Sequence, residues 1–315
     1  MELNKTKTNW TMNRRKFLLL NLFLCLLTFY QTAYSQDDYI SLRIMTYNIR
    51  HGAGMDDVID LDRQASVISA AMPDVVGLQE VDSCVKRSSY KPQAALLGSK
   101  TGMYATFGGA IPLTGGKYGV AILSKERPLS YRNIPLPGTE KRTLLVCEFE
   151  DYVFATTHLD LDEECRLSSL PIILEEASSW DKPFFICGDW NDQPSSTLIT
   201  RMKRNFRFLN FITDNKANYT FPADNPNRII DYIACYPRVK AINSRKSAQV
   251  IGEAEASDHR PVLVEVTLKS YATEIVSPPR EEEEGNDVIY DLSGRRVSGA
   301  NRHGVFIQRG KVILK

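Results

Sequence analysis

Alternation of apolar and polar residues, which is typical of a half-buried β-strand, begins at Tyr39. Ile40, Leu42 and Ile44 fall on one side of this stretch, which ends in the polar sequence TYNIRHG. The run FFICGDWND, residues 184–192, instead places several apolar residues in a row before a glycine. Such a run is typical of a strand that is covered on both faces. Further strands are predicted for DVVGLQE, KYGVAILS, TLLVCEFE, YVFATTHLD, RIIDYIACY and SDHRPVLVEVTL, with a strand pair through Val250.

Apolar residues recur at helical spacing between these strands. Over residues 61–72 they predict a helix whose start would be capped by Asp60 or Asp62. Further helices are expected over PQAALLGSKTG, over about 164–178 and after Pro194. TLLVCEFE and YVFATTHLD would form a hairpin, so strand–helix–strand units are mixed with antiparallel pairs. This mixture predicts an α/β protein with mixed sheets instead of a purely parallel sheet.

The composition changes after residue 270, where YATEIVSPPREEEEGND is rich in Pro and Glu. Residues 271–285 are therefore expected to form an exposed linker. Residues 286–315 have short apolar runs separated by Gly turns, which predicts a short β-rich segment. The globular core is expected over residues 36–270, long enough to bury a large hydrophobic core.

The first 35 residues have the pattern of a secretory signal peptide. Arg14, Arg15 and Lys16 precede the apolar stretch FLLLNLFLCLLTF, and a small-residue cleavage site ends at Ser35. The apolar stretch is short for a helix that spans a membrane. We expect cleavage after Ser35, an exported mature protein and no transmembrane span after the signal peptide is removed.

The charge of the mature protein argues against a polycation. The full chain has 39 Lys and Arg and 38 Asp and Glu, and residues 1–35 hold five of the former and one of the latter. The mature protein is therefore left with 34 basic and 37 acidic residues, a net charge of −3. Nucleic-acid-binding proteins usually carry a basic face. A nucleic-acid substrate is therefore disfavoured without being excluded, because bound cations could bridge to phosphates.

Polar residues accompany the GDWND sequence at other predicted strands. Taken alone, Asp189 and Asn191 are also good turn residues, because Asp and Asn side chains bond their own backbone. Five further strands run into acids, amides or imidazoles, however, and six such strands in one fold predict a functional cluster. The polar residues at these five strands are Asn48, Glu80, His158, Asp231, and Asp258 with His259.

The sequences YNIR, LQE, THLD, GDWND, IDYI and SDHRPV, in this order and spacing, resemble the endonuclease/exonuclease/phosphatase superfamily. This superfamily includes DNase I-like nucleases, inositol-polyphosphate phosphatases and bacterial sphingomyelinases. The resemblance covers about residues 40–268 and implies a four-layer α/β sandwich, in which two mixed β-sheets are flanked by helices. It also implies a metal-dependent phosphoric ester hydrolase.

The resemblance implies a role for each residue of the cluster. Glu80, Asn48 and Asp258 would hold Mg²⁺, with Mn²⁺ as the alternative, because these ions prefer oxygen ligands. Asp189 would orient or deprotonate the attacking water, and Asn191 would hold the water and a phosphate oxygen.

On the phosphate side of the cluster, His158 would donate to the phosphoryl oxygens. His259, oriented by Asp231, is the other candidate for the base, and the sequence does not decide between His259 and Asp189. His51, Tyr118 and Arg142 are candidate substrate-binding residues.

The substrate is left open among several phosphate esters. A small phosphodiester, a phospholipid headgroup or a sugar phosphate suits a near-neutral core better than DNA or RNA does. A nuclease is the alternative within the enzyme class, and a catalytically silent surface binding module is the alternative outside it. The mature protein is expected to be a monomer.

The remaining predictions concern the cysteines and the C-terminus. Five cysteines remain after residue 35, so at least one thiol would be free in an exported protein. Cys84 and Cys165 follow two strands of the cluster, and their loops are predicted to meet in a disulfide. YDLSGRRV and GVFIQRGKVILK resemble the end of the C-terminal sorting segments on exported proteins of Bacteroidetes-type bacteria. A periplasmic or cell-surface location in a Gram-negative bacterium is therefore expected.

Overall fold

The computed structural model describes residues 39–236 and 242–270, and four short strands further along the chain. The predicted signal peptide (1–35) and the predicted linker (271–285) lie outside the described residues. The chain divides into two compact units, Met1–Thr273 and Glu274–Lys315.

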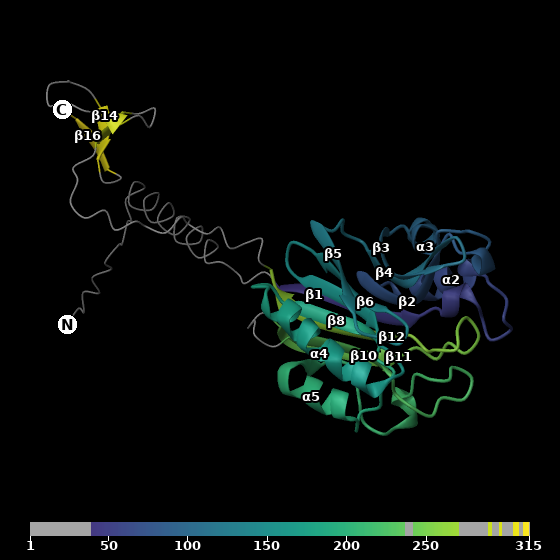
Figure 1. Cartoon of the computed structure of the whole chain (residues 1–315). Helices are drawn as coiled ribbons and strands as arrows, with labels where there is room; N and C mark the ends of the chain where they lie inside the picture. Colours follow the sequence, from purple (N-terminus) through teal and green to yellow (C-terminus); the bar gives the residue numbers. More distant parts are fainter. Residues whose placement is uncertain are drawn as a thin grey trace, which may run out of the picture. The chain divides into compact units, whose positions relative to one another are not determined.

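Two six-stranded mixed sheets, packed face to face, form the centre of the larger unit (Figure 1). The first sheet has the strand order β11-β12-β1-β2-β4-β3, in which only β1 and β2 are parallel neighbours. Its strands are β1 Tyr39–Asn48, β2 Val75–Ser83, β3 Tyr104–Leu113, β4 Gly116–Ser124, β11 Ile242–Val250 and β12 Val262–Lys269.

The second sheet has the order β5-β6-β7-β8-β10-β9, and its only parallel neighbours are β7 and β8. Each sheet thus combines one parallel pair with antiparallel pairs, which confirms the predicted α/β fold with mixed sheets. Its strands are β5 Ser130–Leu136, β6 Arg142–Glu148, β7 Val153–His158, β8 Phe184–Asp189, β9 Arg207–Phe208 and β10 Asp231–Tyr236.

Helices cover the outer faces of both sheets and complete four layers (Figure 1). The helices α2 (Leu61–Ala71) and α3 (Gln93–Thr101) pack on the first sheet, and α4 (Glu163–Ser178) and α5 (Thr197–Asn205) pack on the second. Asp60 caps α2, because its side chain accepts a hydrogen bond from the backbone N–H of Asp62. Short 3-10 helices lie at Arg50–Gly52 (η1), Lys86–Ser88 (η2) and Lys216–Asn218 (η3).

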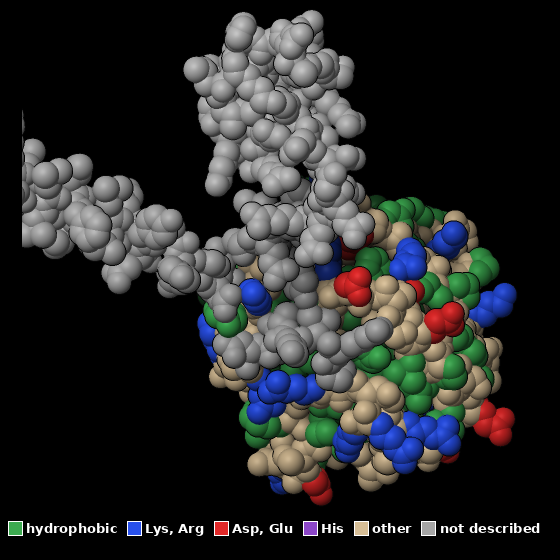
Figure 2. Space-filling view, turned by 90° about the vertical axis from the view of Figure 1, so that its left-hand side faces the viewer, with side chains coloured by type: hydrophobic (Ala, Val, Ile, Leu, Met, Phe, Trp, Pro, Cys, Tyr) green, Lys and Arg blue, Asp and Glu red, His purple; other side chains and the backbone are tan. Residues whose placement is uncertain are grey.

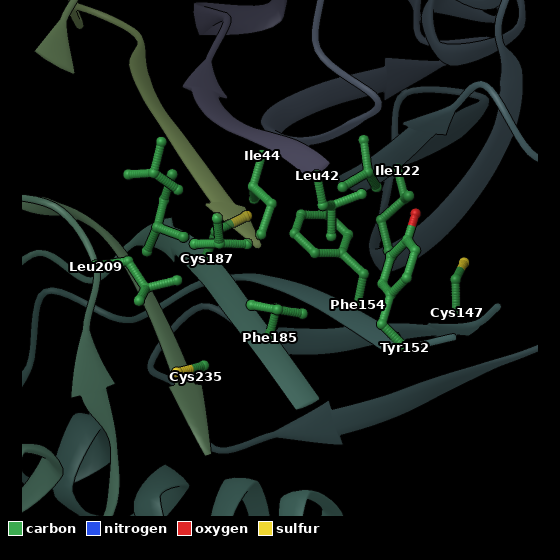
Figure 3. Close-up of a cluster of buried hydrophobic side chains, with 14 of the residues drawn as sticks. Leu42, Ile44, Ile122, Cys147, Tyr152, Phe154, Phe185, Cys187, Leu209 and Cys235 are labelled. Carbon is green, nitrogen blue, oxygen red and sulfur yellow. The ribbon is translucent and has the colours of Figure 1, made fainter. Parts of the chain in front are cut away.

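Apolar side chains from the facing sides of the two sheets fill the space between them (Figure 3). Ile44 of β1 and Phe185 of β8 are both fully buried there. Gly77 of β2 lies in close contact with the second sheet, because an added Cβ would lie 2.2 Å from the Sγ of Cys187. A glycine is therefore required at this position, since any larger residue would push the sheets apart.

This topology places the polar residues predicted for the cluster at one end of the strands in both sheets. The parallel pairs β1/β2 and β7/β8 have their C-terminal ends there. The antiparallel β10 instead begins there, with Asp231 paired opposite Asp189. Asp258 and His259 likewise precede β12, which runs antiparallel to β1. The sequence interpretation that all six strands run into the cluster is thus wrong for β10 and β12, which start from it.

Three strands of the larger unit, β3, β5 and the two-residue β9, are absent from the sequence prediction. β3 contains Gly108 and Gly109 and is mostly half-exposed, and β5 contains Pro135 and is mostly exposed. Each strand lies at an edge of its sheet, where neither burial nor a full set of ladder hydrogen bonds imposes an apolar pattern. Only one strand, β11, is described in place of the predicted strand pair through Val250, and residues 237–241 before it lie outside the described part of the chain.

The smaller unit contains one four-stranded antiparallel sheet in the order β14-β13-β15-β16. All four strands lie within residues 286–315, for which the sequence predicts β-structure. Their bounds are β13 Ile289–Asp291, β14 Arg296–Val297, β15 Val305–Gln308 and β16 Lys311–Leu314.

Candidate active site

A cavity of about 530 Å³ opens at the edge where the two sheets bring their polar residues together. Most of the residues that the sequence predicts for the site line this cavity. These are Glu80, Tyr118, Arg142, His158, Asp189, Asn191, Asp258 and His259. Three other predicted residues, Asn48, His51 and Asp231, do not line it, although Asn48 and Asp231 contact residues that do.

The end of β8 explains how Asp189 and Asn191 converge. The strand stops at Asp189, and Asn191 adopts a left-handed backbone conformation with a φ of 49°. The carboxylate of Asp189 accepts a hydrogen bond from the backbone N–H of Asn191 at 2.9 Å. This is the turn chemistry considered as the simpler interpretation, and it coexists with a place in the cavity. The left-handed turn, not strand alternation, therefore brings the two side chains to the same side.

His259 lies between two aspartates from the second sheet. Its Nδ1 is 3.0 Å from Oδ2 of Asp231, and its Nε2 is 3.5 Å from Oδ2 of Asp189. Burial alone would lower the pKa of His259, but the carboxylates of Asp231 and Asp189 outweigh it and raise the pKa to about 10. Burial raises the pKa of Asp189 to about 7, although the His259 charge opposes this rise. His259 is therefore an imidazolium near neutral pH, and Asp189 is poised to gain or lose a proton there.

His158 has the opposite character. Its Nε2 lies 3.0 Å from Nδ2 of Asn191, and its Nδ1 lies 3.4 Å from a guanidinium nitrogen of Arg142. Burial, reinforced by the charge of Arg142, holds the pKa of His158 well below its ordinary value. The site thus combines a neutral and a charged imidazole. Both rings are buried, and no histidine appears among the described residues on the face shown in Figure 2.

Asn48 connects carboxylates that belong to different sheets. Its amide nitrogen donates to Glu80 at 3.2 Å and to Asp189 at 3.1 Å, and its amide oxygen accepts the backbone N–H of Arg50. This orientation differs from the predicted role of Asn48 as an oxygen ligand. It makes Asn48 a donor that connects Glu80 of the first sheet with Asp189 of the second.

Glu80 and Asp258 form the acidic side of the cavity. Glu80 lies at an irregularity of β2, with a left-handed φ of 57° that turns its side chain away from the strand pattern. Burial raises the pKa of Glu80; the hydrogen bond from Asn48 opposes the rise and the Asp258 carboxylate adds to it. The nearest cation described for Asp258 is Arg50, whose Nε lies 3.8 Å away. A divalent cation between these carboxylates would compensate this charge, so the residues fit an oxygen-ligated metal.

A second group of potential ligands is Asp189, Asp231 and His259, whose ligand atoms lie within 4.8 Å of one another. A histidine must be neutral to bind a metal through its ring nitrogen. Because the pKa of His259 is raised to about 10, its ring is held as a cation by the two aspartates. The charges thus favour Glu80 and Asp258 as the metal side.

Tyr118 and Arg142 lie where the sequence places substrate-binding residues. Arg142 is mostly buried and reaches Glu140 at 3.0 Å and Asp160 at 3.5 Å. The hydroxyl of Tyr118 stays protonated, because burial raises its pKa far above the ordinary range. His51 is outside the cavity, since it lies in η1 and its carbonyl accepts a hydrogen bond from Gln93. The place of His51 outside the cavity could not be predicted, because it depends on the turn that η1 makes immediately after β1.

Two residues that contact the site, Asp160 and Phe221, were not predicted from the sequence. Asp160 binds Thr139 and the backbone N–H of Glu140, which fixes the segment that precedes Arg142. Its place in the THLD sequence is the signal that could have identified it. Phe221 lies in a connecting segment, and its ring centroid is 4.7 Å from that of His259. No periodic pattern marks such a loop residue.

The predicted disulfide between Cys84 and Cys165 is wrong. Both cysteines are free in the structure, as are the other three cysteines in the described part of the chain. Cys84 follows β2 of the first sheet, whereas Cys165 is in the first turn of α4, which packs on the second sheet. Ends of strands at one edge therefore do not bring the following loops into contact.

Comparisons with known proteins agree with this fold. The family model described as "Endonuclease/Exonuclease/phosphatase family" matches residues 45–259. No curated protein matches the chain. Within the described residues, no helix has the length and apolar character needed to cross a membrane.

Solved structures share the fold at low sequence identity. An endonuclease/exonuclease/phosphatase structure from Bacteroides vulgatus has 22% identity and a TM-score of 0.60, covering 73% of this chain and 100% of that one. One from Beutenbergia cavernae has 24% identity and a TM-score of 0.59, covering 73% and 72%. A mannosyl-6-phosphatase from Bacteroides thetaiotaomicron has 18% identity and a TM-score of 0.57, covering 71% and 99%.

Proposed function

Because this chain belongs to the endonuclease/exonuclease/phosphatase family, we propose that it hydrolyses a phosphate ester by metal-assisted attack of water. The observation that carries the proposal is the convergence of three groups on one cavity: the acidic pair Glu80 and Asp258, the Asp189 carboxylate and the buried His259 imidazolium. Phosphoester hydrolysis requires such groups, since the phosphoryl charge must be neutralised, a water must be deprotonated and the leaving oxygen must be stabilised.

Glu80 and Asp258 would hold the metal, and we propose Mg²⁺, with Mn²⁺ as the alternative. When bound, the metal supplies positive charge that polarises a phosphoryl oxygen and stabilises the developing charge of the transition state. Asn48 keeps Glu80 in place through its amide hydrogen bond.

Asp189 is the base in this proposal. Its pKa of about 7 lies close to neutral pH, which is the most effective range for a general base. His259 is less suited to accept that proton, because the carboxylates of Asp231 and Asp189 raise its pKa and favour the imidazolium. His259 instead presents a positive charge next to the reacting group, and Asp231 orients its ring.

Three further side chains would bind the phosphoryl oxygens. Arg142 contributes a fixed positive charge on the second sheet, and its contacts with Glu140 and Asp160 hold the guanidinium in place. Asn191 and the neutral His158 lie 3.0 Å apart and face the same cavity. These groups are already ordered in the structure, so little reorganisation is needed when the substrate binds.

The substrate is proposed to be a small phosphodiester, a lipid headgroup or a sugar phosphate. Nucleic acid is the second candidate, because the family includes nucleases, but the net charge of −3 after residue 35 gives a polyanion little attraction. A silent binding module would have no need of a buried, strained Glu80 or a poised Asp189. The mannosyl-6-phosphatase that shares the fold makes a phosphorylated sugar a suitable first substrate to test.

Hydrolysis with and without metal tests the proposed function. The protein is assayed with Mg²⁺ or Mn²⁺ on p-nitrophenyl phosphate, bis-(p-nitrophenyl) phosphate, sphingomyelin, inositol phosphates, sugar phosphates and plasmid DNA. We expect at least one small ester to be hydrolysed, and EDTA to abolish the reaction. Equal rates in EDTA would refute the metal assignment, and inactivity on every ester with either metal would favour the binding module.

We also propose that the protein is exported and acts as a monomer in the periplasm or at the surface of a Gram-negative bacterium. The support is the signal-peptide pattern of residues 1–35 and the sorting-like sequence within residues 286–315. Fractionation of cells that produce the full chain would test the location, and light scattering would test the monomer.

A further inference from the structure

A second cavity, of about 400 Å³, adjoins the site cavity. Gln193 and Arg228 line both cavities, and the consecutive residues Ile229 and Ile230 line one each. The second cavity is therefore next to the position of the reacting phosphate. A group attached to that phosphate could extend into it without leaving the protein surface.

The walls of the second cavity are rich in neutral hydrogen-bonding groups. Asp214 and Arg228 contribute one charge of each sign, and the hydroxyl of Tyr219 donates to Asp214. Pro194 and Ile229 are the apolar members of the lining. The polar members are Gln193, Ser195, Asp214, Tyr219, Asn227 and Arg228.

The segment from Phe221 to Arg228 lies between the two cavities, and several contacts hold it against the site. Phe221 and Arg228 form a β-bridge across it, and the Arg228 guanidinium lies 5.0 Å from the centre of the Phe221 ring. The backbone N–H of Ala223 donates to the carbonyl of Asp258 at 2.7 Å. Because Phe221 also lies against His259, the walls of both cavities are fixed relative to the catalytic groups.

This composition disfavours two classes of leaving group. A polynucleotide requires a continuous basic track, yet the site cavity has five carboxylate residues in its lining and only Arg142 and Arg228 as arginines. A lipid chain requires an extended apolar groove, which two apolar residues in the second cavity do not supply. Groups that both donate and accept hydrogen bonds match hydroxyls instead.

We propose that the second cavity binds the leaving group of the substrate, and that this group is a polyhydroxylated ring, as in a hexose phosphate or an inositol phosphate. The inference rests on the proposed phosphoesterase function. Asn227, Ser195 and Gln193 would bind ring hydroxyls, and Pro194 and Ile229 would offer an apolar wall to the ring. A cavity built to hydrogen-bond hydroxyls discriminates strongly against an analogue that lacks them.

The test compares esters that have the same phosphate and different leaving groups. Glucose 6-phosphate and myo-inositol 1-phosphate carry ring hydroxyls, whereas p-nitrophenyl phosphate carries none. The variants Asn227→Ala and Tyr219→Phe each remove one hydrogen-bonding group from the second cavity. Asn225→Ala is the matched control, because Asn225 is exposed in the same segment and lines neither cavity.

The readout is kcat/KM for each hydroxylated ester divided by kcat/KM for p-nitrophenyl phosphate. We expect each second-cavity variant to lower this ratio about three- to tenfold for the preferred ester, the effect of one lost hydrogen bond. Asn225→Ala should leave the ratio within twofold. If the ratio falls for one of glucose 6-phosphate and inositol 1-phosphate but not for the other, the ester affected identifies which ring is bound. Thermal unfolding checks that the variants fold.

Two outcomes separate this inference from the proposed function. If the wild-type protein hydrolyses p-nitrophenyl phosphate with metal, but hydrolyses neither hydroxylated ester or neither ratio responds to the variants, the second cavity does not bind such a ring. Preference for an oligonucleotide would overturn the inference in the same way. If no ester is hydrolysed under any metal condition, the phosphoesterase function itself is wrong.

Discussion

Replacement of Asp189 by Asn should raise the stability of the metal-free protein at alkaline pH and remove most of its activity. The side chains have nearly the same shape, and an amide can serve the turn at the end of β8 as well as a carboxylate. The change therefore removes a buried charge with little effect on packing. Stability and activity should respond in opposite directions, which a mere turn residue would not cause.

The size of the stability effect follows from the pKa of Asp189. Burial raises this pKa from an ordinary value of 3.8 to about 7. Above pH 7 the ionised carboxylate therefore destabilises the folded state by at most about 4 kcal/mol, and below pH 3.8 this penalty is absent. This value already includes the attraction to His259, but the Asn amide has one acceptor oxygen fewer and so loses the hydrogen bond from either Asn48 or Asn191, which offsets part of the gain. A net gain of about 1–3 kcal/mol corresponds to a rise in Tm of roughly 3–10 °C for a domain of this size.

The assay is thermal unfolding in EDTA at pH 8.5 and at pH 4.5, together with kcat in the presence of metal. We expect the Tm of Asp189→Asn to exceed that of the wild type at pH 8.5, and the difference to shrink towards zero at pH 4.5. The kcat should fall about a hundred- to ten-thousand-fold, the usual contribution of a general base. Asp224→Asn, at an exposed carboxylate three residues after Phe221, is the matched control and should change neither quantity.

A gain in Tm that is the same at both pH values would show that the charge of Asp189 is not the cause. Wild-type turnover on the preferred substrate would refute the assignment of Asp189 as the base. Either result would indicate that Asp189 in GDWND has only the structural role of a turn residue.

Three further predictions follow from the site and the core. Glu80→Gln should abolish most metal-stimulated activity and weaken metal binding measured by calorimetry while the fold persists; unchanged metal affinity would contradict its role as a ligand. His259→Asn should lower stability most below pH 6.5, because the raised pKa of His259 stabilises the folded state while the ring is protonated, and this difference should decline as the pH approaches 10. A constant difference across that range would argue against the ion pair. All five cysteines after residue 35 should react with a thiol reagent in denaturant without prior reduction. If only three thiols react, two cysteines are paired and the predicted Cys84–Cys165 disulfide would have to be reconsidered.

The parts of the fold that were predictable are those in which burial imposes a pattern. β8 and β10 are buried over almost their whole length, and their apolar runs were evident in the sequence. β3 and β5 lie at sheet edges and have no such pattern. Asp60 was identified as a cap because capping depends only on neighbouring residues.

The candidate site divides in the same way. Glu80, Asp189 and His259 lie at or beside buried strands, so their convergence followed from strand order and from resemblance to the family. The orientation of the Asn48 amide depends on contacts between the sheets and could not be read from the chain. The position of Phe221 depends on a connecting segment that is fixed only by long-range hydrogen bonds.

Because the site is divided between two sheets, activity should depend on the sheets staying packed against each other. Asn48 and Glu80 come from one sheet and Asp189 from the other, and each sheet could keep its own hydrogen-bonded ladder if the layers separated. An expanded, molten-globule form would retain its far-UV circular dichroism but lose the Asn48–Asp189 contact. Turnover would therefore vanish at the moment the core admits solvent, before secondary structure melts. A loss of activity would thus report separation of the two sheets before far-UV circular dichroism reports any loss of secondary structure.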